Sequence, residues 1–127
     1  MLANKSAMAT VAVKSLDTAK RFYGGVLGLP IADADAHGGG WVAFKTGDTR
    51  LFAYVSPYAG TNQGTSVTWT LGRDFDAVVD ALRAKGVVFE HYDLPNTTLQ
   101  GDVHVSGEMR VAWFKDPDGN ILNIGNG

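Results

Sequence analysis

The chain has 127 residues, the length of one ordinary domain, and a formal net charge of −2. That charge gives no basic excess for binding nucleic acid through phosphates, and no apolar run approaches the roughly 20 residues of a membrane span. The chain has no cysteine, which excludes disulfides, thiolate nucleophiles and cysteine-ligated zinc. We therefore expect a cytoplasmic protein, with neither nucleic acid nor a membrane as its partner.

The first predicted elements are a strand over residues 8–13 and a helix over residues 15–28. Ser15 is a candidate N-cap of the helix, and Gly24-Gly25 is a candidate end. Apolar residues recur at the helical spacing i, i+3, i+4 and i+7: Ala19, Phe22, Tyr23 and Val26. The pattern predicts an amphipathic helix that packs on one face of a sheet.

The next segment, residues 44–54, predicts two strands joined by a tight turn. A joint follows near residues 56–64, and the same order of elements then begins again. Residues 66–71 predict a strand, and residues 74–86 a helix that runs from a cap at Asp74 to a stop at Gly86. Its apolar residues have the spacing of the first helix: Phe75, Val78, Val79 and Leu82.

The last segment, residues 111–124, again predicts two strands joined by a turn. In the turn Pro117 presets one φ angle, Asp118 can bond its own backbone, and Gly119 allows a positive φ. The chain therefore repeats a strand–helix–strand–strand–strand unit. We predict an α+β fold with one domain over residues 1–127, built from a module at about 6–57 and another at about 64–125.

Because side chains alternate along a strand, one face of each sheet packs under its helix and the other stays apart. The second face is expected to carry Met8 and Thr10 from the first module and Ser66, Thr68 and Thr70 from the second. Asn123 and Ala53 join it if their apolar neighbours pack under the helices. A concave face of small polar residues suits a binding cup. The alternative is a polar sheet face that is turned to solvent.

Aromatic residues occupy equivalent strands of the two modules. Alternation prevents Trp41 and Phe44 from sharing a face, and the same holds for Trp113 and Phe114. One member of each pair should face the cup, and a tryptophan there would make an apolar pocket. Arg110, at the start of a strand, would meet an anionic ligand or else lie at the surface.

Two motifs carry a resemblance to a known family. The segment "VAVKSLDTAKRFYGGVLGLPI" resembles the opening of the vicinal oxygen chelate superfamily, whose members include glyoxalases, bleomycin-resistance proteins and extradiol dioxygenases. The turn "DPDGN" before the final strand is similar to the family's other signature. The resemblance implies two βαβββ modules that form a curved, cup-like mixed sheet with helices on its outer face, and a homodimer.

The resemblance also implies where a metal would bind, because catalytic members hold one divalent ion through four positions. Here those positions fall on Met8, on Ser66 or Val67, near Ala53, and on Asn123. A hard divalent cation needs carboxylates or imidazoles, and these residues offer at most two weak neutral ligands. We therefore expect no metal and no cofactor, and we reject the family's metal-dependent reactions.

The three histidines do not rebuild such a site. His37 and His91 are interpreted as loop or surface residues. His104 alternates with Val103 and Val105, so it points either into the cup or away from it. It would act as a general base only if something buried or oriented it, and an acid within hydrogen-bond reach would favour an enzyme.

Three functional hypotheses remain open. The preferred one is a metal-free protein that binds a small organic molecule, flat or aromatic, including a drug. The alternatives are a metal-independent enzyme of the lyase or isomerase type, and an interaction module whose cup is filled by its own side chains. The predicted ligand-binding residues are Met8, Thr10, Trp41, Ala53, Ser66, Thr68, Thr70, His104, Arg110, Trp113 and Asn123.

Overall fold

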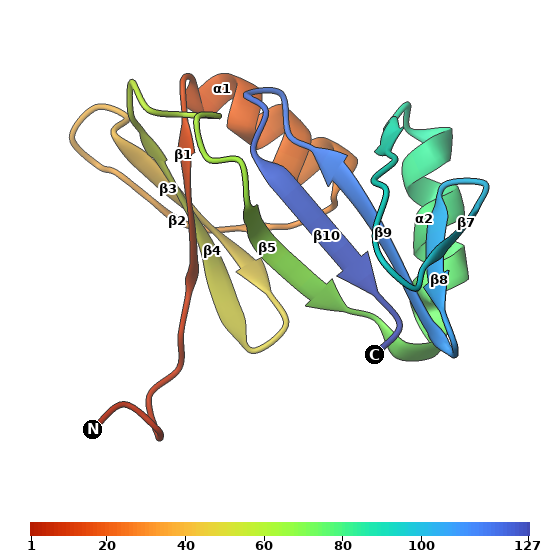
Figure 1. The fold of residues 1–127 in the computed structure, drawn as a ribbon. Helices are drawn as coiled ribbons and strands as arrows, with labels where there is room; N and C mark the ends of the chain where they lie inside the picture. Colours follow the sequence, from red (N-terminus) through yellow and green to blue (C-terminus); the bar gives the residue numbers. More distant parts are fainter. The chain divides into compact units, whose positions relative to one another are not determined.

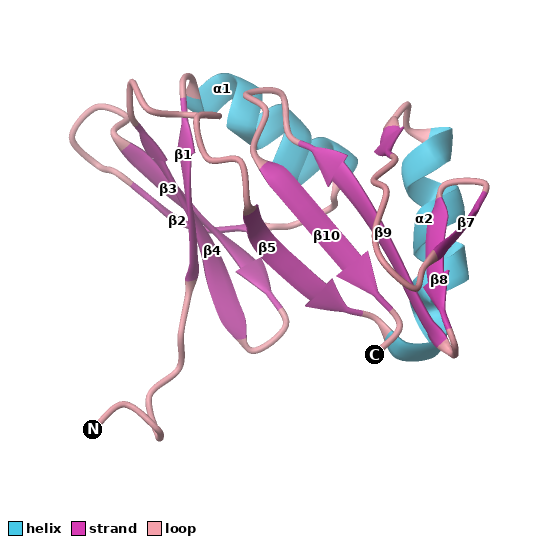
Figure 2. Ribbon diagram, viewed as in Figure 1, coloured by secondary structure: helices cyan, strands magenta, loops and turns pink.

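A computed structural model describes all 127 residues, which divide into two compact units, residues 1–61 and 62–127. Each unit has its own sheet of hydrogen-bonded strands (Figure 1). The fold is mixed α+β, as predicted, with helices and strands from both halves of the chain (Figure 2). Neither helix combines the length and the hydropathy of a membrane span.

The first unit has the predicted order of strand, helix and three strands. It contains β1 (Ala9–Val13), α1 (Leu16–Ala19), the π-helix η1 (Lys20–Val26), β2 (Ile31–Ala34), β3 (Trp41–Thr46) and β4 (Thr49–Val55). The sheet order is β1-β4-β3-β2. β1 runs parallel to β4, whereas the other two pairings are antiparallel.

The first helix begins where the sequence predicts and ends within the predicted range, two residues from its end and beyond the candidate stop at Gly24-Gly25. The Ser15 hydroxyl accepts a hydrogen bond from the Thr18 N–H at 3.3 Å, as an N-cap does. The predicted stop at Gly24-Gly25 is wrong, because η1 continues through both glycines to Val26. The Leu27 N–H donates to the Phe22 carbonyl five residues back, so the helix widens at this point instead of ending.

The two faces of the first sheet differ in burial. Tyr23 of η1 contacts Phe44 with ring centroids 5.8 Å apart, and Phe44, Val11 and Val13 are buried on this side. Trp41 and Phe52 lie on the opposite face, where they stack at 5.3 Å. The core of the unit is therefore the side that η1 covers.

The second unit repeats this plan with two additional strands. It contains β5 (Thr65–Thr70), the 3₁₀ turn η2 (Gly72–Asp74), α2 (Phe75–Ala84), β6 (Phe89–Glu90), β7 (Thr98–Gln100), β8 (Val103–Ser106), β9 (Met109–Lys115) and β10 (Ile121–Gly125). The sheet order is β5-β10-β9-β8-β7, and β6 also pairs with β9. β5 runs parallel to β10, which matches the pairing of β1 with β4.

Two side chains of the second unit make hydrogen bonds that differ from the prediction, one before α2 and one in the last turn. Asp74 precedes α2, but its side chain makes no capping hydrogen bond. In the last turn the organising carboxylate belongs to Asp116, which accepts the N–H groups of Asp118 at 3.0 Å and Asn120 at 2.9 Å. Gly119 has the predicted positive φ, at 95°. The turn therefore lies where the sequence predicts, but the carboxylate that accepts its backbone N–H groups belongs to a different residue.

The core of the second unit lies on the side of its sheet that carries Phe89 and Phe114, whose rings meet at 5.9 Å. Phe114 pairs with Leu122 in the register of β9 and β10, and both are buried. Trp113, the residue before Phe114, projects from the opposite face of the sheet and is partly exposed. Each unit therefore buries its phenylalanine and places its tryptophan on the other face, as strand alternation predicts.

Candidate functional site

Strand register places several of the predicted residues on one face of the second sheet. Asn123 of β10 lies between Thr68 of β5 and Trp113 of β9. His104 of β8 pairs with Val111, which is two residues before Trp113 and so shares its face. This face lies opposite the side that α2 covers, because Phe114 and Leu122 occupy that other side.

Three rings form an aromatic cluster on this face: Tyr92, His104 and Trp113. The imidazole of His104 meets the indole of Trp113 edge-on at 4.9 Å, and Tyr92 lies 5.4 Å from the indole and 6.1 Å from the imidazole. The Trp113 Nε1–H donates to the Thr65 hydroxyl at 3.2 Å, which fixes the indole orientation. His104 is only 1% exposed.

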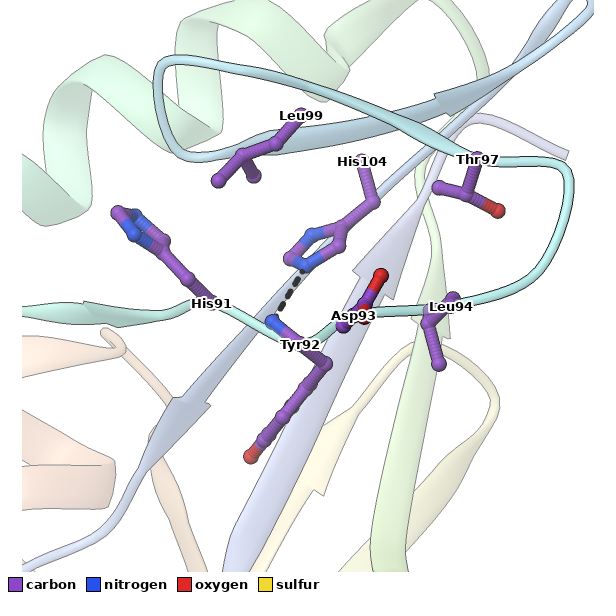
Figure 3. Close-up of a pocket in the computed structure, with 7 residues that line it drawn as sticks. All are labelled: His91, Tyr92, Asp93, Leu94, Thr97, Leu99 and His104. Carbon is purple, nitrogen blue, oxygen red and sulfur yellow. Dashed lines mark hydrogen bonds between the residues drawn. The ribbon is translucent and has the colours of Figure 1, made fainter.

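Two pockets border the aromatic cluster, and Tyr92 contributes to both. The first has a volume of about 370 Å³ and is lined by His91, Tyr92, Asp93, Leu94, Thr97, Leu99 and His104 (Figure 3). The second has a volume of about 250 Å³ and is lined by Gln63, Gly64, Thr65, Tyr92, Trp113 and Ile121. Both belong entirely to the second unit.

Two buried polar atoms of the cluster have no hydrogen-bond partner: the Tyr92 hydroxyl and Nδ1 of His104. The other imidazole nitrogen, Nε2, accepts the Tyr92 backbone N–H at 2.9 Å, drawn as the dashed line in Figure 3. Burial raises the pKa of the Tyr92 hydroxyl, the nearby Glu90 carboxylate adds to the rise, and Lys115 opposes it. Buried polar atoms without protein partners are uncommon, and an ordered water molecule or a ligand would satisfy them.

Asn123 lies on this face, where its side chain is 8% exposed. Its Nδ2 donates to the Ala112 carbonyl at 3.1 Å. The amide is therefore engaged with the backbone of the adjacent strand, β9. This contact gives Asn123 a structural role beside the aromatic cluster.

Two predicted residues face the other way. Ala53 pairs with Val11 in the register of β1 and β4 and is buried on the η1 side, so its placement in the cup is wrong. Phe52 is the β4 residue on the opposite face. Arg110 lies three residues before Trp113 and so on the α2 side of β9, where it bonds Asp76 and covers the ring of Phe75 at 5.3 Å.

The remaining predicted residues lie along β1, β3 and β5. Met8 precedes β1 and is 45% exposed, and Thr10 and Trp41 lie on the face of the first sheet opposite η1. Ser66 accepts a hydrogen bond from Nδ2 of Asn62 at 3.3 Å, and Thr70 is exposed at the end of β5. Ligand binding by these residues stays a prediction.

Tyr92 was not among the predicted site residues, whereas His91 is exposed and follows β6, as its interpretation as a loop or surface residue predicts. Nε2 of His91 lies 2.8 Å from one oxygen of Asp102, whose other oxygen accepts Nε of Arg83 at 2.9 Å. The hydrogen bond from His91, followed by that from Arg83, holds the pKa of the Asp102 carboxyl below its usual value. No periodic pattern singles out Tyr92, since it follows the two-residue strand β6.

The sequence matches the Glyoxalase/Bleomycin resistance protein/Dioxygenase superfamily over residues 5–124, so the chain belongs to that family. This confirms the family resemblance of its motifs. Comparison with curated protein sequences gave no significant match.

Solved structures of the family share the fold at low sequence identity. A bleomycin-binding protein complexed with bleomycin matches with a TM-score of 0.71 and 21% identity, over 98% of this chain and 99% of that chain. Lactoylglutathione lyase from Agrobacterium tumefaciens gives 0.70 and 20%, over 96% and 92%. The fosfomycin resistance protein FosX from Mesorhizobium loti gives 0.69 and 18%, over 100% and 94%.

The divalent metal of the family's catalytic members does not fit the residues present here. The corresponding positions carry the thioether of Met8, the hydroxyl of Ser66 or the apolar side chain of Val67, the methyl group of Ala53, and the amide of Asn123. The Asn123 amide is already bonded to Ala112. No group of three or more His, Asp or Glu side chains elsewhere in the chain is arranged to hold a metal ion.

Proposed function

We propose that this chain is a metal-free binding protein for a flat or aromatic organic molecule, held against Trp113. The observation that carries the proposal is the 250 Å³ pocket that Trp113 and Tyr92 line together. The indole supplies a broad apolar surface for stacking. Tyr92 lines the same pocket, and its buried hydroxyl has no hydrogen-bond partner, so a guest that reaches this oxygen can bond it through a polar group.

The chemistry of the side chains supports binding over metal-assisted catalysis. A divalent ion would need charged or imidazole ligands, and the family's metal positions offer Met8, Ser66 and Asn123. The two pockets also argue against an interaction module whose cup is filled by its own side chains. A small organic molecule is therefore the proposed partner, and no cofactor is invoked.

The fold neighbours agree with this class of ligand. One is a bleomycin-binding protein complexed with bleomycin, so the same fold holds an organic drug in that protein. A strongly cationic drug would favour an acidic cleft, and the net charge of −2 gives little support for one here. An uncharged guest fits the aromatic lining of the pocket better.

The test is native mass spectrometry of the full chain purified from extract of its own cells. We expect a retained organic mass, which Trp113→Ala weakens about tenfold because the stacking surface is lost. Tyr58→Ala removes an aromatic ring that is 75% exposed and serves as the matched control. Stoichiometric binding of added Mn²⁺ or Zn²⁺ at micromolar concentration would overturn the metal-free proposal.

A metal-independent enzyme is the second candidate, because a histidine–carboxylate pair borders the 370 Å³ pocket. Nε2 of His91 is bonded to Asp102, which leaves its Nδ1 as the candidate base. His104, the residue first considered for this role, is buried but bonds the Tyr92 backbone in place of an acid. Turnover that His91→Gln abolishes, with ligand retention intact, would favour this candidate.

Assembly and location complete the proposal. A homodimer is expected from the family resemblance, and Tyr54, which is exposed on the face of the first sheet opposite η1, provides apolar surface that a partner copy would cover. A cytoplasmic location is expected from the absence of cysteine.

A further inference from the structure

We propose that the pocket between residues 91–94 and the β7–β8 hairpin recognises a carbonyl group of an uncharged planar ligand, through Nδ1–H of His104. The inference rests on the proposed function in that it takes a flat organic guest as given. It goes further by naming a second contact region, the atom that makes the contact and the chemical group that it selects.

The hydrogen bonding of His104 defines which atom is offered to a ligand. Nε2 accepts the Tyr92 backbone N–H at 2.9 Å, so this nitrogen carries no proton. A neutral imidazole then holds its proton on Nδ1, which makes Nδ1 a donor. That donor is buried and has no partner in the structure. An acceptor oxygen is the group that would satisfy it.

The pocket around the imidazole has the size and lining of a small-molecule site. Its volume of about 370 Å³ lies within the roughly 300–1,000 Å³ that is usual for such sites. Leu94 and Leu99 supply apolar surface, and Figure 3 places the His104 ring between Leu99 and the segment that carries Tyr92. A flat guest would lie on these side chains with its acceptor directed at Nδ1.

Entry to this atom requires one side chain to move. Nδ1 is shielded from solvent, although the pocket itself is open to it. Leu99 of β7 is the register partner of His104 across the β7–β8 hairpin, and it is 43% exposed. Because Leu99 lies opposite His104 in the hairpin and is partly exposed, we expect it to move when the guest binds.

The charges that line the pocket select among acceptor groups. Asp93 contributes a carboxylate, whereas no lysine or arginine lines the pocket. A carboxylate guest would be repelled by Asp93, and an amide would not. An amide also brings an N–H that a carboxylate oxygen can accept. A neutral amide carbonyl is therefore the favoured ligand group.

The experiment is a titration of the ¹⁵N-labelled full chain with benzamide and, in parallel, with benzoate, followed by NMR of the histidine ring nitrogens and the tryptophan indoles. We expect benzamide to shift the His104 Nδ1–H signal in a saturable way, and benzoate to bind at least threefold more weakly. His104→Gln, which keeps an acceptor for the Tyr92 N–H, should weaken benzamide about three- to tenfold. Leu99→Ala should strengthen it.

His37→Gln makes the same chemical change in an exposed loop and should leave benzamide affinity unchanged. An unmoved His104 signal up to the solubility limit of benzamide would overturn the inference, as would equal affinity in His104→Gln. The Trp113 indole signal reports the proposed function separately. A response of Trp113 without one from His104 would refute only the present inference.

Discussion

At the scale of single residues, Asn123 and His104 show two ways of placing a polar side chain on the face opposite α2. Both are at least nine-tenths buried. Asn123 gives its N–H to the Ala112 carbonyl, so its amide supports the pairing of β9 with β10. His104 satisfies Nε2 through Tyr92 and leaves Nδ1 without a partner. The hydrogen bond of Asn123 is typical of a structural residue, whereas the unpartnered nitrogen of His104 is available to bind a ligand.

We predict that Asn123→Asp destabilises the protein by about 1–3 kcal/mol at pH 7, because it replaces a donor with a charged oxygen beside the Ala112 carbonyl. Urea denaturation measures the change. Asn4→Asp makes the same substitution at an exposed site and should have almost no effect. Equal stability of the two variants would show that the Asn123 amide does not support the sheet.

The Asp102 cluster leads to a prediction of pH dependence. Hydrogen bonds from His91 and Arg83 hold the folded-state pKa of Asp102 below its ordinary 3.8. The resulting stability is present above pH 3.8 and is lost as the pH falls below it, through the folded pKa. Because Arg83 and His91 are about half exposed, solvent screening limits the contribution to on the order of 0.5 kcal/mol.

Asp102→Asn should therefore lower the free energy of unfolding slightly at pH 7 and reduce its dependence on pH below 4. Chemical denaturation at a series of pH values from 3 to 7 tests this. Asp48→Asn, at an exposed position in the β3–β4 turn, provides the control. An unchanged pH profile in Asp102→Asn would contradict the prediction.

At the scale of elements, glycine ends one helix and lies inside the other. Gly86 ends α2 with a φ of +87°, where the Gly86 N–H bonds the Arg83 carbonyl and the Val87 N–H bonds the Leu82 carbonyl. Gly25 lies inside η1 and has no positive φ. The same residue type therefore terminates one helix and continues the other, because backbone conformation differs between the two sites.

We predict that Gly86→Ala destabilises the protein by about 1 kcal/mol, since an L-residue is strained in the left-handed region. Gly25→Ala should be neutral or stabilise by up to about 1 kcal/mol, because an added Cβ meets open space and helical conformation is favoured. Thermal unfolding compares the pair. Similar losses of stability in both variants would contradict this interpretation.

At the scale of the whole molecule, the chain is two compact units of one repeated plan. In each unit a parallel pair of strands, β1 with β4 and β5 with β10, is followed outward by antiparallel neighbours. The second unit differs by β6 and β7, and the segment between them lines the 370 Å³ pocket. The repeat therefore supplies the framework, and the longer second half supplies the candidate site.

We predict a dimer in solution, with a mass of twice 13.5 kDa by sedimentation equilibrium. Tyr54 is 39% exposed on the face of β4 that also carries Phe52, and Tyr54→Glu should weaken association because it places a charge on an apolar surface. Tyr58→Glu is the control in an exposed turn. A monomer at all concentrations would contradict the prediction.

Local patterns in the sequence were sufficient to predict most of the architecture. Apolar spacing located both helices, and alternation separated Phe114 from Trp113. The same alternation places Arg110 and Trp113 on opposite faces of the continuous strand β9. The sequence alone was therefore sufficient to exclude Arg110 from the face that carries Trp113. The face of Ala53 could not be predicted in this way. It depends on the strand register, and a register shift of one residue turns the side chain to the opposite face.

By itself, the sequence determined the order of the elements and the opposite faces of Trp113 and Phe114, because these follow from apolar spacing and strand alternation along the chain. Only the tertiary structure decided that Tyr92, His104 and Trp113 meet around two pockets. Their meeting depends on the pairing of β6, β8 and β9, and such pairing is set by contacts between segments that are distant in sequence.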